Sequence, residues 1–225
     1  MTIAKIGVNK LGEYMTANPA RRRQIVKIQK QDKTFIFGRY NDARSSIVTY
    51  ISGGMTDDKT LLENAEILRN FTDESEFKQS DKHASSEAIE DFFEASEEIS
   101  LEKLDALPGS QFESHSINIG GIAVTTKPDI ILKNKETGEV EGCIKLHFSK
   151  TAPLSSDAGQ YVATIMKTYL EQGLCKGKNV DPKKCYVIDT PTASVFVAPK
   201  AYKKRMNEIE AACEEIKARW DTSSS

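Results

Sequence analysis

Hydrophobic residues recur three or four positions apart over most of the first hundred residues, a spacing that predicts amphipathic helices. The clearest case is residues 86–99, where Ile89, Phe92 and Ile99 share one side and acidic residues cover the rest. Helices are expected over residues 9–31 (two, split at Asn18-Pro19), 41–51, 56–69 and 86–99. Helical spacing continues beyond the last of them through Leu101, Leu104 and Leu107 and ends at Pro108. A short strand is expected over residues 34–40, and a loop or frayed helix over residues 71–86.

The pattern changes after residue 111 to alternating or continuous apolar runs, separated by turn signals at Gly120-Gly121, Lys127-Pro128 and residues 136–138. Such runs predict antiparallel strands. Strands are expected over residues 112–119, 122–126, 129–132 and 143–148, then a helix over 155–173, strands over 185–188 and 194–197, and a last helix over 199–220.

This order predicts an α+β protein with an α/β-like core, in which a mixed central β-sheet is flanked by helices. Residues 1–84 are expected to form an N-terminal helical region. Residues 85–225 are expected to form the core that contains the sheet.

The composition fits a folded chain with a substantial core, since 39% of the 225 residues are hydrophobic. The formal net charge is -2, so nucleic-acid binding would depend on a local basic patch. No apolar run approaches the roughly 20 residues of a membrane span, and the N-terminus lacks the apolar segment of a secretory signal. The four cysteines show no CxxC pair, which favours free thiols over a zinc site. We therefore expect a cytoplasmic protein without a membrane partner.

Candidate chemistry concentrates between Lys127 and Lys150. Asp129 follows Pro128 at the start of an expected strand, where a carboxylate is exposed enough to bind a metal; a turn aspartate gives the same pattern. On the next strand alternate residues share a face, and these are Glu141, Cys143, Lys145 and His147. The lysine could stabilise negative charge on a phosphate, and a solvated outer face would also produce this pattern.

Asp129 before one strand and Lys145 within the next resemble the motif of the PD-(D/E)XK nuclease superfamily, in particular its RecB-like exonuclease branch. The following helix carries Gln160, Tyr161 and Tyr169, and is similar to the helix with glutamine and tyrosine in that branch. The resemblance covers roughly residues 85–220. The order of helix, strands, helix and strands contributes more to the resemblance than the individual residues of the motif.

The resemblance implies a metal-dependent DNA nuclease that acts in defence, recombination or repair. In that superfamily an aspartate and a second acid two residues before the lysine bind Mg²⁺ or Mn²⁺, and the lysine assists the attacking water, so that a phosphodiester bond is hydrolysed. Carried over, Asp129 is the first acid and Lys145 the lysine. The position of the second acid holds Cys143, and a thiol is a poor ligand for these oxygen-preferring cations.

Three explanations for Cys143 stay open. In the first, Glu141 replaces the missing acid, so that Asp129, Glu141 and Lys145 are catalytic and the two acids bind the metal. In the second, an acid of the 86–99 helix completes the site, with Glu87, Glu90 and Glu94 as candidates. In the third, the site is inactive and the fold binds nucleic acid, a protein partner or another copy of the chain.

Basic and polar side chains around this core are the expected contacts to DNA. They are Arg21, Arg22, Arg23, His147, Lys150 and Gln160. The three arginines open a helix in which basic and apolar residues alternate, which suits contact with a phosphate backbone. A solvated helix face has the same composition.

Overall fold

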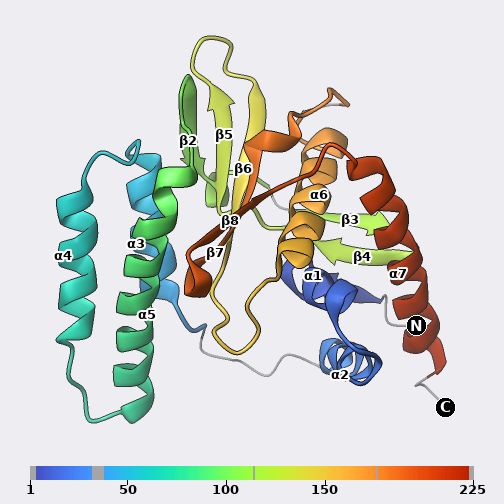
Figure 1. The fold of residues 1–225 in the computed structure, drawn as a ribbon, viewed down its shortest axis with the longest axis horizontal. Coiled ribbons are helices and arrows are strands. Elements are labelled where there is room, and N and C mark those ends of the chain that lie inside the picture. The colour runs from blue at the N-terminus through green and yellow to red at the C-terminus, as the bar shows by residue number, and fades with distance from the viewer. Residues whose placement is uncertain (1–3, 32–37, 114, 176, 223–225) are drawn as a thin grey trace.

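The computed structural model describes residues 4–31, 38–113, 115–175 and 177–222. Its centre is a five-stranded sheet in the order β2-β5-β6-β7-β8 (Figure 1). The strands are β2 (Leu104–Pro108), β5 (Ile130–Asn134), β6 (Val140–His147), β7 (Cys185–Asp189) and β8 (Ser194–Val197). The pairs β2–β5, β5–β6 and β7–β8 are antiparallel, and β6–β7 is parallel. The sheet is therefore mixed, and α6 (Ser156–Gln172) makes the crossover between its two parallel strands.

One face of this sheet is covered by α3 (Asn41–Ser52) and α5 (Glu76–Ala95), on the left of Figure 1. Helix α4 (Asp58–Arg69) packs on the outer side of these two helices. Their apolar side chains form one core with Ile144 and Leu146 of β6.

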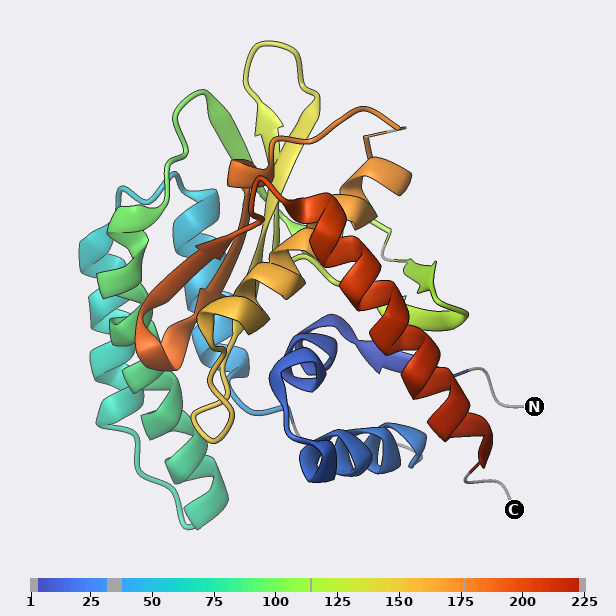
Figure 2. The ribbon, with the colours of Figure 1, turned by 45° about the vertical axis from the view of Figure 1, so that its right-hand side comes forward.

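The opposite face carries α6, together with elements from both ends of the chain and a small second sheet (Figure 2). These are α1 (Val8–Thr16), α2 (Pro19–Lys30), α7 (Tyr202–Thr222) and a small sheet in the order β1-β4-β3, formed by β1 (Lys5–Gly7), β4 (Ile122–Thr125) and β3 (Ser116–Ile119). A second core lies here and includes Cys143, Val187 and the buried side of α6. The expected α+β class, with helices on both sides of a mixed sheet, is confirmed. None of the helices in the described ranges has the length and apolar character of a membrane span.

The leucine spacing predicts a helix through residues 101–107, and this prediction is wrong. Strand β2 lies there and pairs with all of β5, from Leu104 opposite Asn134 to Pro108 opposite Ile130. Leu104 and Ala106 are buried whereas the residue between them is exposed, a period of two that the leucine spacing hides. Pairing with a neighbouring strand therefore outweighs the local helical pattern.

The N-terminal half differs from the expectation in three further places. Helix α5 begins at Glu76, within the stretch expected to be loop or frayed helix, and its start is capped by Ser75, which accepts a hydrogen bond from the Lys78 amide. The expected boundary between residues 84 and 85 falls inside this helix. Strand β1 was not expected, and the strand expected over residues 34–40 lies mostly outside the described residues. The cap of α2 by Asn18, with Pro19 in the first turn, is confirmed.

Both faces of β6 are buried, whereas alternation along this strand predicts one polar, accessible face. Cys143, Lys145 and His147 are only 0%, 8% and 7% exposed. The alternative of a solvated outer face is therefore wrong, because α6 and the N-terminal elements cover this side of the sheet, which sequence alternation alone cannot reveal. A lysine inside such a layer requires specific partners for its charge.

Candidate functional site

Asp129 lies at the bend that leads into β5, next to β6. Its amide donates to the Ile144 carbonyl at 2.9 Å, and its carbonyl accepts from the Gly109 amide at 2.8 Å. Its side chain is only 6% exposed. Oδ2 accepts hydrogen bonds from Lys145 Nζ at 2.9 Å and from the Leu146 amide at 2.8 Å. The backbone thus fixes the carboxylate against the middle of β6.

Lys145 and Asp129 form a nearly enclosed ion pair. The lysine side chain is 10% exposed, and its ammonium also donates to the Lys127 carbonyl at 2.7 Å. The sequence predicts these two residues to act together, and the structure brings them into direct contact. A charge that leaves water requires such partners, because otherwise the loss of hydration is not compensated.

Arg44 is the third charged member of this site, and sequence reasoning missed it. It lies on α3, and its Nη1 donates to Asp129 Oδ1. Its guanidinium carbon lies 4.9 Å from the centroid of the Phe148 ring, so the planar group rests on an aromatic face as well. No local motif marks Arg44, because its partners Asp129 and Phe148 are distant in sequence and approach only in the folded chain.

A cavity of about 590 Å³ opens beside these three side chains. Its lining includes Arg44, Lys127, Asp129 and Lys145, together with apolar and hydroxyl-bearing residues from α3, the end of β2, the bend before β5, and α6. Three of the lining residues are cationic, and one carries a carboxylate. An anion is therefore the ligand favoured by charge at this cavity, which we call the Asp129 cavity.

Glu141 does not reach the Asp129 cavity. It accepts a hydrogen bond from Asn134 Nδ2 at 2.8 Å and forms an ion pair with Lys184. The hydrogen bond from Lys184 lowers the pKa of Glu141, as does the one from Asn134. A shift in register between Leu132 and Lys133 further separates this end of the β5–β6 pair from the end that holds Asp129. The geometry does not support Glu141 as a second ligand beside Asp129.

The acids of α5 also lie elsewhere. Glu87 forms an ion pair with Lys150, and Glu90 with Arg69. Glu87 and Glu90 line a different cavity, which Lys150 and Thr192 also border. Glu94 is exposed on the same helix and is not part of the lining of the Asp129 cavity.

Cys143 is fully buried and cannot replace an acid. It lies opposite Cys185 in the register of β6 and β7. The hydrogen bond with Cys185, together with burial, raises the pKa of the Cys143 thiol well above its ordinary value. A protonated thiol does not bind a hard cation.

The residues at Asp129 therefore do not fit Mg²⁺ or Mn²⁺. Both carboxylate oxygens already accept hydrogen bonds from cationic side chains, and the position for a second acid holds a neutral thiol. Within the described ranges, no group of three or more His, Cys, Asp or Glu side chains is arranged to hold a metal ion.

The arginines expected to contact DNA lie on α2, on the far side of the second core. Arg21 Nε donates to Glu13 at 2.6 Å. Arg22 donates to backbone carbonyls of α1 and to Glu215 of α7. Arg23 is exposed. Arg21 and Arg22 thus hold helices together, and none of the three lines the Asp129 cavity.

His147, Lys150 and Gln160 are also separate from this cavity. His147 Nε2 lies 2.9 Å from the Ala152 carbonyl, and burial lowers the pKa of the imidazole. Lys150 is exposed and paired with Glu87, as described above. Gln160 accepts a hydrogen bond from Arg205 of α7 at 2.9 Å. Tyr169 of the same helix as Gln160 does line the cavity.

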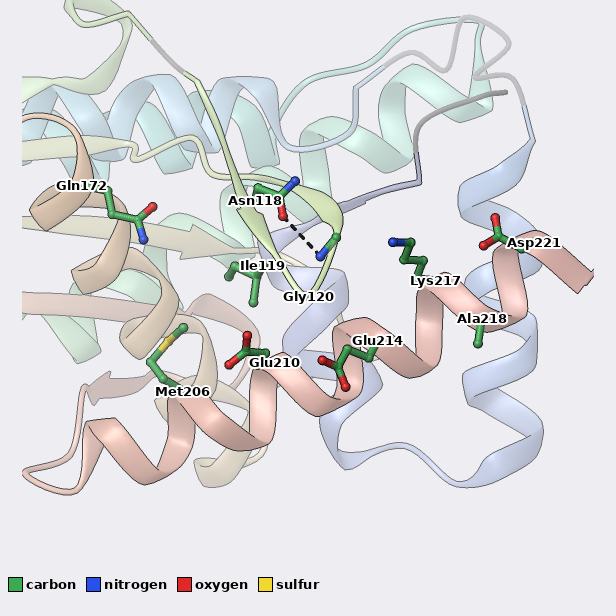
Figure 3. Close-up of a pocket in the computed structure, with 11 residues that line it drawn as sticks. Asn118, Ile119, Gly120, Gln172, Met206, Glu210, Glu214, Lys217, Ala218 and Asp221 are labelled. Atoms are coloured by element: carbon green, nitrogen blue, oxygen red, sulfur yellow. Dashed lines mark hydrogen bonds between the residues drawn. The ribbon is translucent and has the colours of Figure 1, made fainter.

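A second cavity, of about 760 Å³, lies between the β3–β4 turn, the end of α6 and α7 (Figure 3). Asn118 Oδ1 accepts from the Gly121 amide at 3.2 Å and shapes the turn at its edge. The charged lining residues are Glu210, Glu214, Lys217 and Asp221, so its balance is acidic. This surface repels phosphate, which leaves the Asp129 cavity as the better candidate for an anion.

Comparison with protein-family models gives no match for this chain. Comparison with curated protein sequences gives no match either. Function is therefore inferred from the geometry of the chain itself.

Proposed function

We propose that this chain is a nuclease-like protein that binds nucleic acid through a phosphate at the Asp129 cavity and does not cleave it with a metal ion. The observation that carries the proposal is the set of three cationic side chains around one carboxylate whose oxygens both accept from protein donors. Such a set attracts an oxyanion without needing a bound cation.

The order of the elements supports the nuclease-like part of the proposal. Helix α5 precedes three antiparallel strands of the central sheet, with β3 and β4 inserted between them, and α6 then crosses over to the parallel strand β7. This is the order of helix, strands, helix and strands on which the resemblance to PD-(D/E)XK nucleases rests. Asp129 lies at the bend before β5 and Lys145 on the adjacent strand β6, with Lys145 Nζ 2.9 Å from Asp129 Oδ2.

Arg44 and Lys127 are the groups best placed to meet a phosphate. Arg44 is 40% exposed on its side chain, and Lys127 is exposed at the rim. Lys145 is enclosed, so it acts on a ligand mainly through its field and by holding Asp129. Half-buried Phe112 and buried Tyr169 add apolar surface, which suits a nucleotide better than inorganic phosphate.

Fluorescence anisotropy with labelled single-stranded and duplex DNA tests the proposal. We expect binding that weakens with added salt and is the same in EDTA as in Mg²⁺ or Mn²⁺. Arg44→Gln and Lys127→Gln should each lower the slope of log affinity against log salt by about 0.7 to 0.9, the effect of losing one phosphate contact. Lys59→Gln, at an exposed position on α4, is the matched control and should leave binding unchanged.

Two results contradict the proposal. Absence of salt-dependent binding at low ionic strength removes nucleic acid as the ligand. Mg²⁺- or Mn²⁺-dependent cleavage that Asp129→Asn and Lys145→Met both abolish would establish the second candidate, a metal-dependent DNA nuclease, which the motif-like placement of an aspartate and a lysine at one hairpin favours.

A further inference from the structure

Arg44 occupies one oxygen of the carboxylate that the motif would offer to a metal. Its Nη1 contacts Asp129 Oδ1, while Lys145 and the Leu146 amide take Oδ2. Arg44 comes from α3, an element of the N-terminal part of the chain and outside the nuclease-like unit of helix, strands and crossover helix.

Two contacts orient the Arg44 guanidinium at this place. One is the carboxylate of Asp129, and the other is the ring of Phe148, 4.9 Å below the guanidinium carbon. The described hydrogen bonds of the Arg44 guanidinium use one nitrogen, Nη1. A guanidinium carries five N–H donors, so further donors remain for an oxyanion in the cavity that Arg44 lines.

We infer that the Arg44 guanidinium takes the place of a divalent cation at Asp129. It supplies the positive charge that binds a phosphate and excludes the metal from the carboxylate. The inference rests on the proposed function for its ligand and goes further in assigning the roles. Arg44 is the group that contacts the anion, and Asp129 is a positioning residue for Arg44 and Lys145.

Electrostatic repulsion disfavours binding of a metal ion at this site while Arg44 is present. A divalent ion bound to Asp129 would approach the cationic groups of Arg44 and Lys145, both already in contact with the same carboxylate. Repulsion from two fixed cations opposes entry of a third positive group. Removal of Arg44 takes away one of these repulsions and frees Asp129 Oδ1 as an oxygen ligand.

Mn²⁺ binding, followed by the electron paramagnetic resonance signal of the free ion, tests this inference without any measurement of cleavage. We expect wild-type protein to take up little Mn²⁺ and Arg44→Gln to take up at least about tenfold more at the same free concentration, a change that Asp129→Asn reverses in the double variant. Arg44→Lys retains a cation and should resemble wild type. Arg69→Gln, which breaks an exposed ion pair with Glu90 on α4 and α5, is the matched control.

DNA binding gives a second readout. Arg44→Gln should weaken binding in EDTA by about tenfold or more, as expected for one lost hydrogen bond to a charged group. Added Mn²⁺ should restore affinity in this variant and leave wild type unchanged, because the ion can then join Asp129 to a phosphate. Circular dichroism checks folding, and Arg44→Leu, which keeps packing on Phe148, repeats both measurements if Arg44→Gln does not fold.

Two outcomes overturn the inference. One is Mn²⁺ uptake by wild type that Asp129→Asn abolishes. The other is equal Mn²⁺ uptake by wild type and by folded Arg44→Gln or Arg44→Leu. If wild type binds no DNA, the proposed function fails, while the Mn²⁺ titration still decides whether Arg44 excludes the metal.

Discussion

Replacement of Asp129 by alanine tests whether the ion pair under the cavity stabilises the fold. The side chain of Asp129 is 6% exposed and receives hydrogen bonds from Arg44, from Lys145 Nζ at 2.9 Å and from the Leu146 amide at 2.8 Å. Its removal leaves the ammonium of Lys145, which is 10% exposed, without a counter-charge. The variant should therefore unfold more easily than wild type.

The size of the effect follows from what each partner loses. Breaking one side of a buried ion pair costs about 3–5 kcal/mol. The upper part of that range does not apply, because Lys145 keeps the Lys127 carbonyl at 2.7 Å and Arg44 is exposed enough to reach water. We expect a loss of about 3 kcal/mol in the free energy of unfolding for Asp129→Ala, and about 1–2 kcal/mol for Asp129→Asn, which keeps an acceptor for the Leu146 amide.

Urea unfolding measures these values, followed by far-ultraviolet circular dichroism and by the fluorescence of the single tryptophan, Trp220, which is buried. The double variant Asp129→Ala/Lys145→Met removes both charges and should be more stable than Asp129→Ala alone, with a coupling energy of at least about 1 kcal/mol. A loss below about 0.5 kcal/mol for Asp129→Ala, or additive effects in the double variant, would refute a tightly coupled buried pair.

Three further predictions concern stability away from the cavity. Burial lowers the pKa of His147 in the folded chain, so the unfolded chain binds more protons than the folded chain below about pH 6.5. As the pH is lowered from about 7 to 5, the free energy of unfolding should therefore fall more steeply in wild type than in His147→Gln. Gly142→Ala places a Cβ 2.1 Å from the Lys184 carbonyl oxygen and should cost about 1–3 kcal/mol in urea unfolding, whereas Gly7→Ala, with open space around it, should cost less than about 1 kcal/mol. Asn18→Ala removes the cap of α2 and should lower the free energy of unfolding by about 1 kcal/mol.

Local patterns in the sequence were sufficient to predict most helices and strands. The apolar side of residues 86–99 corresponds to the buried side of α5, and the Asn18-Pro19 signal marks the start of α2. Leu104 shows where local patterns fail to predict the element. Leucines spaced three residues apart are compatible with a helix, and only pairing with β5 makes this segment a strand. Burial of the second face of β6 depends on α6 and α1, which no pattern within the strand can reveal.

Some residues of the candidate site could likewise be predicted from local patterns, and others could not. Asp129 and Lys145 could be predicted because one hairpin holds both, so strand geometry brings them together. Glu141 was misjudged because a shift in register and its ion pair with Lys184 place it at the other end of the hairpin. Arg44 could not be found, because its contact with Asp129 joins helices of the N-terminal half to the central sheet.

Charge balance connects the cysteine at position 143 with the arginine at position 44. In the arrangement that the resemblance implies, two carboxylates, one divalent cation and one lysine leave a single positive charge. Here one carboxylate, Asp129, with the cations of Arg44 and Lys145, leaves the same single positive charge without a metal. A second carboxylate at position 143 would be fully buried and would have to be neutralised as well, which neither cation could do without leaving Asp129. The neutral thiol of Cys143 and the guanidinium of Arg44 therefore maintain the same charge balance together. Changing either residue alone should disturb the charge balance of the site more than changing both.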